Sequence, residues 1–600
     1  MCGICGELRF DGGEPDLSGL QRVMARLARR GPDHEGVYAD GPVILGHRRL
    51  AIIDLSAHSH QPMVDKALGL TLVFNGTIYN YRELRRELSA LGYRFFSEGD
   101  SEVILKGYHA WGEDCVERFN GMFAFAIWNE AEQSLFLGRD RAGIKPLYYS
   151  LDGARLRFAS TLPALLAAGG VDTTLDPVAL HHHLTLHAVV PAPRTILKGV
   201  RKLAPGHVMT IDANGKSETR PYWHLKARRP VMQLGEQAWL VRVRESLLAA
   251  VERQQTAADV PVGVLLSGGL DSSLLVGLLD QLGHREVQTF SIGFGDLDLA
   301  GADSGNEFIY SDAVASHFRT RHRKYLIPDA EVLAALPEVV DQMSEPMVSQ
   351  DVAAFYLLAQ RVSRSVKVVM SGQGADEVFG GYFWYPKMDA EPGTPLEKFA
   401  RHYFDRDHAE YLTTVGDAFA VDDVTSTLVA ARLAEPDADS FLDQVLRFDA
   451  TTLIVDDPVK RVDNMTMAWG LEARVPFLDH ELVELAMSMP PELKLKEGGK
   501  WPLKAIARGL IPDSVIDRPK GYFPVPAFKY PRGRFLDFMR GVLDSEACRQ
   551  RRLFRRDTVE TLLAAPMDHT TRLQGAKVWH LALLEYWLQR HVDAAREPMR

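Results

Sequence analysis

The chain has 600 residues, of which 46% are apolar and 25% are charged, and its formal net charge is −10. Because this length exceeds what one ordinary hydrophobic core accommodates, two or more domains are expected. The composition excludes a disordered or fibrous protein, and the acidic balance gives no support to a nucleic-acid partner.

The start of the chain and its few cysteines indicate a cytoplasmic protein. Residues 1–11 lack the basic and then apolar segments of a signal peptide, and no run of ~18 apolar residues predicts a membrane span. Four cysteines are too few for a disulfide framework, which favours a reducing compartment. We expect small-molecule partners, no nucleic acid and no membrane, and we leave a homo-oligomer open.

Strand-like runs dominate the chain up to about residue 205. These short apolar runs are separated by turn residues and lie at 43–45, 50–53, 72–74, 122–128 and 135–137. Short helical patterns, such as that at 81–91, occur between them. The pattern predicts a layered α+β domain over residues 1–205.

The pattern changes in the second part of the chain. Residues 206–235 are interpreted as a connecting segment with a hairpin signal at Asn214 and Gly215. Over 236–600, amphipathic helices alternate with short buried strands, which are expected at 262–266, 288–292 and 366–370. Such alternation predicts a doubly wound parallel α/β sheet, and the residues from about 450 onward are expected to be helical.

Cys2 combines a nucleophile with a base once the initiator methionine is removed. The α-amino group exposed by that removal has an ordinary pKa of about 7.7–8.0, so part of it is a neutral base near neutral pH. A thiol is intrinsically nucleophilic and needs only modest activation. A redox pair or half a zinc site formed with Cys5 are the alternatives, although neither Cys115 nor Cys548 has a paired neighbour to complete a zinc site.

Several further motifs accompany Cys2. They are RGPD at 30–33, HRRL at 47–50, NGTIYN at 75–80, EGDSE at 98–102 and GRDRAGIKPLY at 138–148. Together they resemble the class II glutamine amidotransferase domain, an Ntn-hydrolase-like glutaminase whose nucleophile is an N-terminal cysteine. The resemblance covers the whole of the first domain.

The resemblance assigns a role to each matching residue. Cys2 is the nucleophile, and Asn75 and Gly76 form the oxyanion hole, for which a side-chain amide and a backbone N–H are suited. Arg49 holds the glutamine carboxylate, and Asp100 holds its ammonium. The other residues implied to bind glutamine are Leu50, Ile53 and Thr77. The family usually has glutamate at the position of Thr77, so this pocket has one carboxylate fewer near the expected ammonium.

A phosphate-binding loop is predicted where an apolar strand runs into a helix at 262–274. In its segment SGGLDSS, at 267–273, the glycines expose backbone N–H groups, the serines add hydroxyl donors, and the helix start favours an anion. The segment resembles the pyrophosphate loop of ATP pyrophosphatases rather than the GxxxxGK[ST] loop. The ATP-binding residues expected here are Leu265, Ser267, Gly268, Gly269, Leu270, Asp271, Ser272 and Ser273.

A second strand ends in glycines and two acids at 368–382, VVMSGQGADEVFGGY. With SGGLDSS and the segments at 462–467, 471–480 and 518–523, it resembles the asparagine synthetase domain. The resemblance implies adenosine contacts from Leu265, Ile292, Ser371 and Gly372. It also implies that Asp271 and Asp376 reach Mg²⁺-pyrophosphate, in line with the preference of Mg²⁺ for carboxylates beside phosphates.

Two more residues are implied to act in the chemistry. Lys520 matches a lysine that stabilises the charged adenylation transition state, and Glu345 matches a glutamate of the acyl-adenylate step. The chain as a whole thus resembles the glutamine-dependent asparagine synthetase family. Such an enzyme adenylates a carboxylate with ATP and amidates it with ammonia from glutamine, which we expect to travel along an apolar passage between the domains.

The acceptor carboxylate is expected to depend on residues 344–358. The family commonly reads Glu-Pro-Phe-Ala-Asp-Pro-Ser there, whereas residues 345–351 read EPMVSQD, so Ser349 and Asp351 reverse the positions of acid and hydroxyl. Relocated charge in a buried pocket is expected to select a different substrate. With Thr77 and the opening CGICGELRFDG, this segment looks closest to the branch that amidates N-acetylglutaminylglutamine, an osmoprotectant dipeptide.

Three alternatives remain. The first is an asparagine synthetase that acts on aspartate. The others are an inactive scaffold homologue and a hydrolase that only releases ammonia. The intact Cys2, SGGLDSS loop and Lys520 argue against the scaffold, and the complete ATP loop argues against the simple hydrolase.

Overall fold

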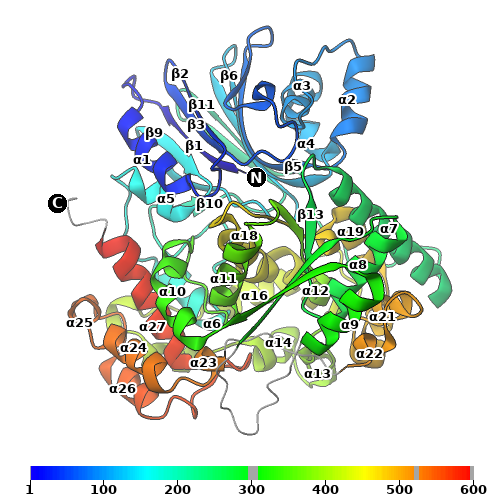
Figure 1. Cartoon of the computed structure of the whole chain (residues 1–600). Helices are drawn as coiled ribbons and strands as arrows, with labels where there is room; N and C mark the ends of the chain where they lie inside the picture. The colour runs from blue at the N-terminus through cyan, green and yellow to red at the C-terminus, as the bar shows by residue number, and fades with distance from the viewer. Residues whose placement is uncertain (1, 295–307, 519–525, 595–600) are drawn as a thin grey trace.

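The computed structural model describes residues 2–294, 308–518 and 526–594, so Lys520 lies outside the described residues. Figure 1 shows an N-terminal domain, in blue and cyan, stacked on a larger domain that runs from green to red. The N-terminus lies where the two domains meet. None of the described helices is both long and apolar enough to cross a membrane.

Two antiparallel sheets of six strands form the centre of the N-terminal domain. The first has the order β10-β8-β9-β1-β3-β2, with β1 (Cys2–Arg9), β2 (His34–Asp40), β3 (Val43–Arg49), β8 (Tyr148–Leu151), β9 (Arg155–Ala159) and β10 (Arg201–Lys202). The second has the order β12-β11-β7-β6-β5-β4, with β4 (Met63–Asp65), β5 (Leu70–Ile78), β6 (Gly121–Asn129), β7 (Ser134–Arg139), β11 (His207–Asp212) and β12 (Ser217–Pro221).

The two sheets pack face to face, and helices cover their outer faces. Inward side chains such as Ile4, Leu8, Val73 and Trp128 form a dry core between the sheets. Helices α1 and α5 pack on the first sheet, and α3, which packs against α2, lies on the second. The helices of this domain are α1 (Leu17–Leu27), α2 (Tyr81–Ala90), α3 (Ser101–Trp111), α4 (Cys115–Arg118), α5 (Leu162–Ala167) and α6 (Pro177–Thr185). The predicted layered α+β fold is confirmed.

The hairpin in the expected connecting segment belongs to the second sheet. Its turn at Asn214 and Gly215 is present, with Gly215 at φ +81°, a conformation that favours glycine. Strand β11 pairs with β7, and its Val208 and Ile211 are buried. Val208 and Ile211 point to opposite faces of β11 and join two different apolar clusters, so both faces of the strand are covered and the sheet continues beyond residue 205 to Pro221 of β12.

A parallel sheet of five strands organises the C-terminal domain, in the order β15-β14-β13-β16-β17. The strands are β13 (Val262–Leu265), β14 (Gln288–Phe294), β15 (Arg321–Ile327), β16 (Val368–Met370) and β17 (Glu472–Arg474). The three predicted strands correspond to β13, β14 and β16. The other two were not predicted, because β15 is an edge strand rich in basic residues and β17 is only three residues long.

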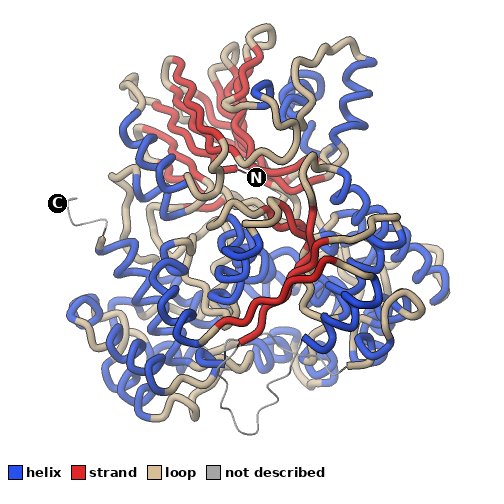
Figure 2. Tube along the Cα trace, in the orientation of Figure 1, coloured by secondary structure: helices blue, strands red, loops and turns tan. Residues whose placement is uncertain are grey.

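Helices cover both faces of this sheet (Figures 1 and 2), which confirms the doubly wound class. Helices α8 and α9 lie on one side, and α10 and α11 lie on the other. The helices between residues 236 and 448 are, in chain order, α7 (Glu236–Thr256), α8 (Leu270–Gln281), α9 (Phe308–Phe318), α10 (Asp329–Asp341), α11 (Val352–Val362), α12 (Ala375–Phe379), α13 (Trp384–Ala390), α14 (Pro395–Tyr403), α15 (His408–Thr414), α16 (Val424–Leu433) and α17 (Phe441–Phe448).

The C-terminal part of the domain is helical apart from β17 and short 3₁₀ and π turns. Its helices are α18 (Lys460–Met467), α19 (His480–Ser488), α20 (Pro491–Leu495), α21 (Trp501–Ala507), α22 (Asp513–Ile516), α23 (Pro526–Lys529), α24 (Gly533–Leu543), α25 (Glu546–Arg551), α26 (Arg556–Ala564) and α27 (Lys577–Leu588). Helix α18 lies beneath the N-terminal domain, near the N-terminus of the chain (Figure 1).

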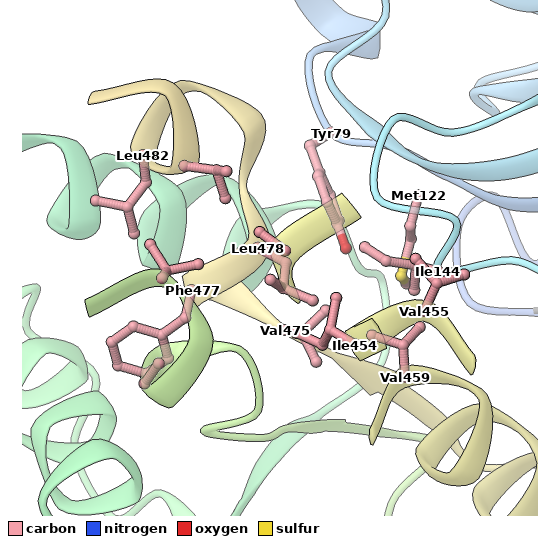
Figure 3. Close-up of a cluster of buried hydrophobic side chains, with 14 of the residues drawn as sticks. Tyr79, Met122, Ile144, Ile454, Val455, Val459, Val475, Phe477, Leu478 and Leu482 are labelled. Carbon is pink, nitrogen blue, oxygen red and sulfur yellow. The ribbon is translucent and has the colours of Figure 1, made fainter. Parts of the chain in front are cut away.

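The two domains share a buried interface that is partly apolar and partly charged. In Figure 3, Met122 and Ile144 of the N-terminal domain lie close to Val455 and Val459 of the other domain, and all four are buried. Beside this cluster, Asp463 of α18 accepts from Arg30 Nη1 at 2.8 Å and from Lys145 Nζ at 3.2 Å. Burial opposes the charge of Asp463, but the two cations outweigh it and lower the pKa of this carboxyl.

Replacing Asp463 with alanine is expected to destabilise the protein strongly. The change leaves the buried Arg30 and Lys145 without their shared partner, which costs about 3–5 kcal/mol in comparable sites. Thermal unfolding followed by circular dichroism measures the effect. The control is Glu484→Ala. It removes an exposed hydrogen bond across the same interface, in which Trp223 Nε1 donates to Glu484 Oε1 at 2.7 Å. Equal losses of stability in the two variants would contradict the assigned importance of Asp463.

Candidate active sites

Cys2 is the first residue of β1 and lies opposite Arg49 of β3. It is only 6% exposed, and its backbone nitrogen donates to Asn75 Oδ1 at 2.9 Å. Burial raises the pKa of the Cys2 thiol, while a hydrogen bond from the Leu50 backbone and the charge of Arg49 oppose that shift. The thiol is therefore mostly protonated near neutral pH, and a base beside it is needed to form the thiolate.

Asn75 and Gly76 lie on β5, next to Cys2. Asn75 is fully buried, and within the described residues its Nδ2 has no hydrogen-bond partner. A buried amide without a hydrogen-bond partner destabilises the fold by roughly 1–3 kcal/mol. The free N–H of Asn75 next to Cys2 is therefore suited to donate to an oxygen atom of a ligand. Any Cβ at Gly76 would lie 2.1 Å from the carbonyl oxygen of Met122, so only glycine allows this approach of β5 to β6.

Arg49 is fixed by backbone carbonyls rather than by a carboxylate. Its Nη1 donates to the Ser56 carbonyl at 2.9 Å, and its Nη2 donates to the carbonyls of Ile53 and Asp54. No carboxylate of the described residues forms an ion pair with it. Leu50 and Ile53 are buried beside it, as expected for a pocket wall. A pinned guanidinium with an uncompensated charge can bind the carboxylate of an amino acid.

Asp100 and Thr77 are the remaining residues that the sequence assigned to glutamine binding. Asp100 Oδ2 accepts from the Ile78 backbone N–H at 3.0 Å, and burial, with a smaller contribution from Glu472, raises the pKa of its carboxyl to about 6. Thr77 Oγ1 lies 3.4 Å from Oε1 of Glu472, which belongs to the other domain. The structure thus brings together all the residues that the sequence assigned to the glutamine pocket.

The SGGLDSS segment forms the expected turn between β13 and α8. Helix α8 has Gly269 as its N-cap, with no side-chain cap, so its first N–H groups are left for a ligand. Gly268 has φ +72°, and the turn is stabilised by hydrogen bonds from the backbone nitrogens of Ser267 and Gly269 to serine hydroxyls. This geometry suits an anion.

Two adjoining cavities lie at the carboxyl ends of the parallel strands, the usual position of ligands in open α/β sheets. The smaller, about 180 Å³, is lined by Leu265, Ser267, Asp271, Ser272, Ile292, Ser371, Gly372 and Asp376, together with residues around Asp351 and Phe355. The larger, about 590 Å³, is lined by Ser267, Gly269, Leu270, Asp271, Asp376, Lys500 and Arg518, among others. Gly268 and Ser273 line neither cavity.

Lys500 is a site residue that sequence reasoning missed. Its Nζ lies 2.7 Å from Asp271 Oδ2 and 2.8 Å from Asp376 Oδ1, and the two carboxylates raise its pKa in spite of burial. Two carboxylates that converge on one cation form a donor set that also fits Mg²⁺. Nothing in the local sequence could have revealed Lys500, because the contact joins three distant segments.

Glu345 lies between the domains and lines neither cavity. Its Oε2 accepts from Lys202 Nζ at 2.9 Å, with Lys460 Nζ and the Tyr148 hydroxyl at 3.4 Å. Its Oε1 is buried and has no hydrogen-bond partner within the described residues. Lys202 and Tyr148 belong to the N-terminal domain, so Glu345 connects the two halves of the molecule.

Asp351 lines the smaller cavity from the start of α11. It accepts from Ser349 Oγ at 2.7 Å and forms an ion pair with Arg461 Nε at 3.0 Å. Burial raises the pKa of its carboxyl, although the charge of Arg461 opposes the shift. Arg461 also pairs with Asp457, so its charge is compensated twice.

Comparison with known proteins agrees with both halves of the site. Residues 1–223 match the glutamine amidotransferase domain, and residues 242–589 match asparagine synthase. The glutamine-hydrolysing asparagine synthetase 1 of Bacillus subtilis is 30% identical, over 100% of this chain and 98% of its own length. Asparagine synthetase 3 of the same species is 29% identical over 98% of this chain and 99% of its own length. Asparagine synthetase B of Escherichia coli is 29% identical over 87% of this chain and 82% of its own length.

Replacing Cys2 with alanine is expected to separate the two half-reactions. Release of glutamate from glutamine should fall more than about 1,000-fold, because the nucleophile is lost. Pyrophosphate release driven by added ammonia should stay within about twofold of wild type. The matched control is Cys5→Ala, since Cys5 is buried in the same strand and its Sγ donates to the Gly46 carbonyl rather than facing Asn75. If ammonia fails to support the Cys2 variant, the division of labour between the sites is wrong.

Glutamine binding is expected to weaken as the pH falls through about 6, the pKa of the Asp100 carboxyl. Above this pH the Asp100 carboxylate is ionised and can attract the ammonium of glutamine. Below it the carboxylate becomes protonated, and the affinity for glutamine should fall by at most about tenfold per pH unit. Calorimetry on the Cys2→Ala variant measures binding without turnover or titration of the thiol. The Asp100→Asn variant should bind weakly with no such dependence, and a dependence that persists in it would contradict the assignment.

Proposed function

The chain belongs to the asparagine synthase family as an ATP-dependent, glutamine-hydrolysing amidotransferase, and we propose that the carboxylate it amidates is that of N-acetylglutaminylglutamine. The observation that carries this proposal is the set of charged side chains that line the smaller cavity beside the ATP loop. The same proposal assigns the individual residues of both half-reactions.

In the glutaminase half, Cys2 Sγ attacks the side-chain amide carbon of glutamine. The α-amino group of the processed Cys2 takes the thiol proton and passes it to the departing ammonia. Asn75 Nδ2 and the Gly76 backbone N–H donate to the oxyanion, while Arg49 and Asp100 hold the two charged groups of the amino acid. Water then hydrolyses the thioester and releases glutamate. The unpartnered Asn75 Nδ2 supports this assignment.

In the synthetase half, the acceptor carboxylate attacks the α-phosphorus of ATP, and pyrophosphate leaves. Ammonia then attacks the acyl-adenylate, and AMP leaves. The N–H groups at the start of α8 and the serines of the loop bind the phosphates. Asp271 and Asp376 would hold Mg²⁺, which neutralises phosphate charge when bound. Lys520 is proposed to stabilise the adenylation transition state, and Glu345, located between the domains, to take a proton from the attacking ammonia.

The cavity favours an acceptor whose only charge is the carboxylate that reacts. Its described charged residues are Asp271, Asp351 and Asp376, and no cation lines it. Free aspartate carries a second carboxylate and an ammonium, and the cations next to this cavity, Lys500 and Arg461, are already paired with its acids. Asp351 is already engaged by Arg461 and Ser349, which reduces its value as a partner for a free ammonium. An acetylated dipeptide with amide side chains presents neither extra charge.

Aspartate is the second candidate, because all three relatives described above are named asparagine synthetases. The shared domain order and the full-length match support this alternative. It differs from the first proposal only in the acceptor, so one assay decides between them.

The expected result is faster AMP formation with N-acetylglutaminylglutamine than with aspartate, by at least about tenfold in kcat/KM. AMP is measured with ATP, glutamine and one acceptor at a time. Glutaminylglutamine is the matched control, because it differs by the acetyl group alone and carries a free ammonium, and it should react poorly. Faster reaction with aspartate would identify an asparagine synthetase, and no AMP with any of the three would also reject the dipeptide.

A further inference from the structure

Glu472 reaches the glutamine pocket from the other domain. It is the first residue of β17 and is completely buried, and its Oε1 lies 3.4 Å from Thr77 Oγ1 on β5. Burial is the main cause of the raised pKa of both the Cys2 thiol and the Asp100 carboxyl, and the negative charge of Glu472 adds a smaller contribution to each. The carboxylate therefore lies within electrostatic reach of the nucleophile and of the residue expected to bind the substrate ammonium.

The position of Glu472 is fixed by a buried arginine. Arg474 Nε donates to Glu472 Oε1 at 2.6 Å, and its Nη2 donates to the Ala257 carbonyl at 2.9 Å. Arg474 is the main cation that lowers the pKa of Glu472 against the effect of burial, so Glu472 is ionised. A charged side chain without rotational freedom is suited to binding a small ligand, because little entropy is lost on binding.

The donors and acceptors of the pocket indicate what Glu472 would bind. The ammonium of glutamine has three N–H donors. Asp100 already uses Oδ2 for the Ile78 N–H and forms no ion pair with any described residue. Thr77 offers a hydroxyl instead of a second acid, but that hydroxyl is directed at Glu472. A second carboxylate is thus present next to position 77, although it comes from a residue 395 positions away in sequence.

We propose that Glu472 binds the α-ammonium of glutamine together with Asp100, so that the synthetase domain completes the glutaminase pocket. The inference rests on Cys2 as the glutaminase nucleophile but is independent of the acceptor. Arg49 on one side and the two carboxylates on the other then match the opposite charges of the amino acid.

The same strand connects the pocket with the ATP site. The backbone carbonyl of Arg474 accepts from the Ser371 N–H at 2.8 Å, and Ser371 lines the smaller cavity. Strand β17 pairs in parallel with β16, with Glu472 opposite Val368. Strand β17 therefore connects Glu472 with a residue that lines the smaller cavity.

The test compares two substrates in the Glu472→Gln variant. One is glutamine, and the other is glutaramate, which is glutamine without its α-amino group. Glutamate or glutarate release is measured, so the assay does not depend on the acceptor. Loss of a charged hydrogen bond should lower kcat/KM for glutamine about 10- to 100-fold while leaving that for glutaramate unchanged. Ammonia-driven pyrophosphate release, measured in parallel, shows whether the synthetase site of the variant is still folded.

Two further variants separate binding from structure. Glu484→Gln changes an exposed carboxylate at the same interface and should leave the preference for glutamine intact. If Glu472→Gln does not fold, the Glu472→Gln/Arg474→Gln double variant removes both charges and leaves no buried charge unpaired. Equal losses with both substrates, or an unchanged preference for glutamine in a folded variant, would overturn the proposal. Intact glutamine hydrolysis in Cys2→Ala would instead reject the nucleophile on which it rests.

Discussion

The buried ion pair between Glu472 and Arg474 lies where the two domains and both candidate sites meet. Arg474 is completely buried and donates to the carbonyls of Gln254 and Ala257 at the end of α7. Its own carbonyl holds Ser371 at the ATP cavity, and its side chain holds Glu472 at the glutamine pocket. Because a buried charge is tolerated only with near-complete compensation, these contacts leave little freedom to β17. Arg474 thus helps to fix the relative position of the two sites, together with the other buried contacts between the domains.

The features that the sequence could predict are those set by local chemistry. The SGGLDSS turn follows from glycines and serines between an apolar strand and a helix, and the loop before α8 has that form. The roles of Lys500 and Glu472 have no such local origin. Lys500 acquires its role only because Asp271 and Asp376, from two different strand ends, converge on it. Glu472 was part of a recognised segment, but its contact with Thr77 depends on how the domains pack.

The two candidate sites hold their charged side chains differently, and the difference agrees with the substrates proposed for them. The glutamine pocket has one uncompensated cation, Arg49, and a carboxylate, Asp100, which forms no ion pair with a described residue. This is the pattern that a zwitterion requires. Near the ATP loop, Asp271 and Asp376 share Lys500, so binding of a polyphosphate must rearrange or recruit cations there.

In the proposed mechanism, ammonia formed at Cys2 would cross the region of α18, which lies between Cys2 and the rest of the synthetase domain. Arg30 contacts the Cys2 carbonyl and Asp463 of α18, and Lys460 of the same helix contacts Glu345. These charged groups are mutually paired, and the apolar cluster beside them contains Met122 and Val455 (Figure 3). Neutral ammonia gains little from a paired carboxylate and can cross apolar contacts, whereas ammonium would be held by Asp463 or repelled by its cations. Under the proposed mechanism, the protonation state in which ammonia leaves Cys2 would therefore determine whether the nitrogen reaches the second site.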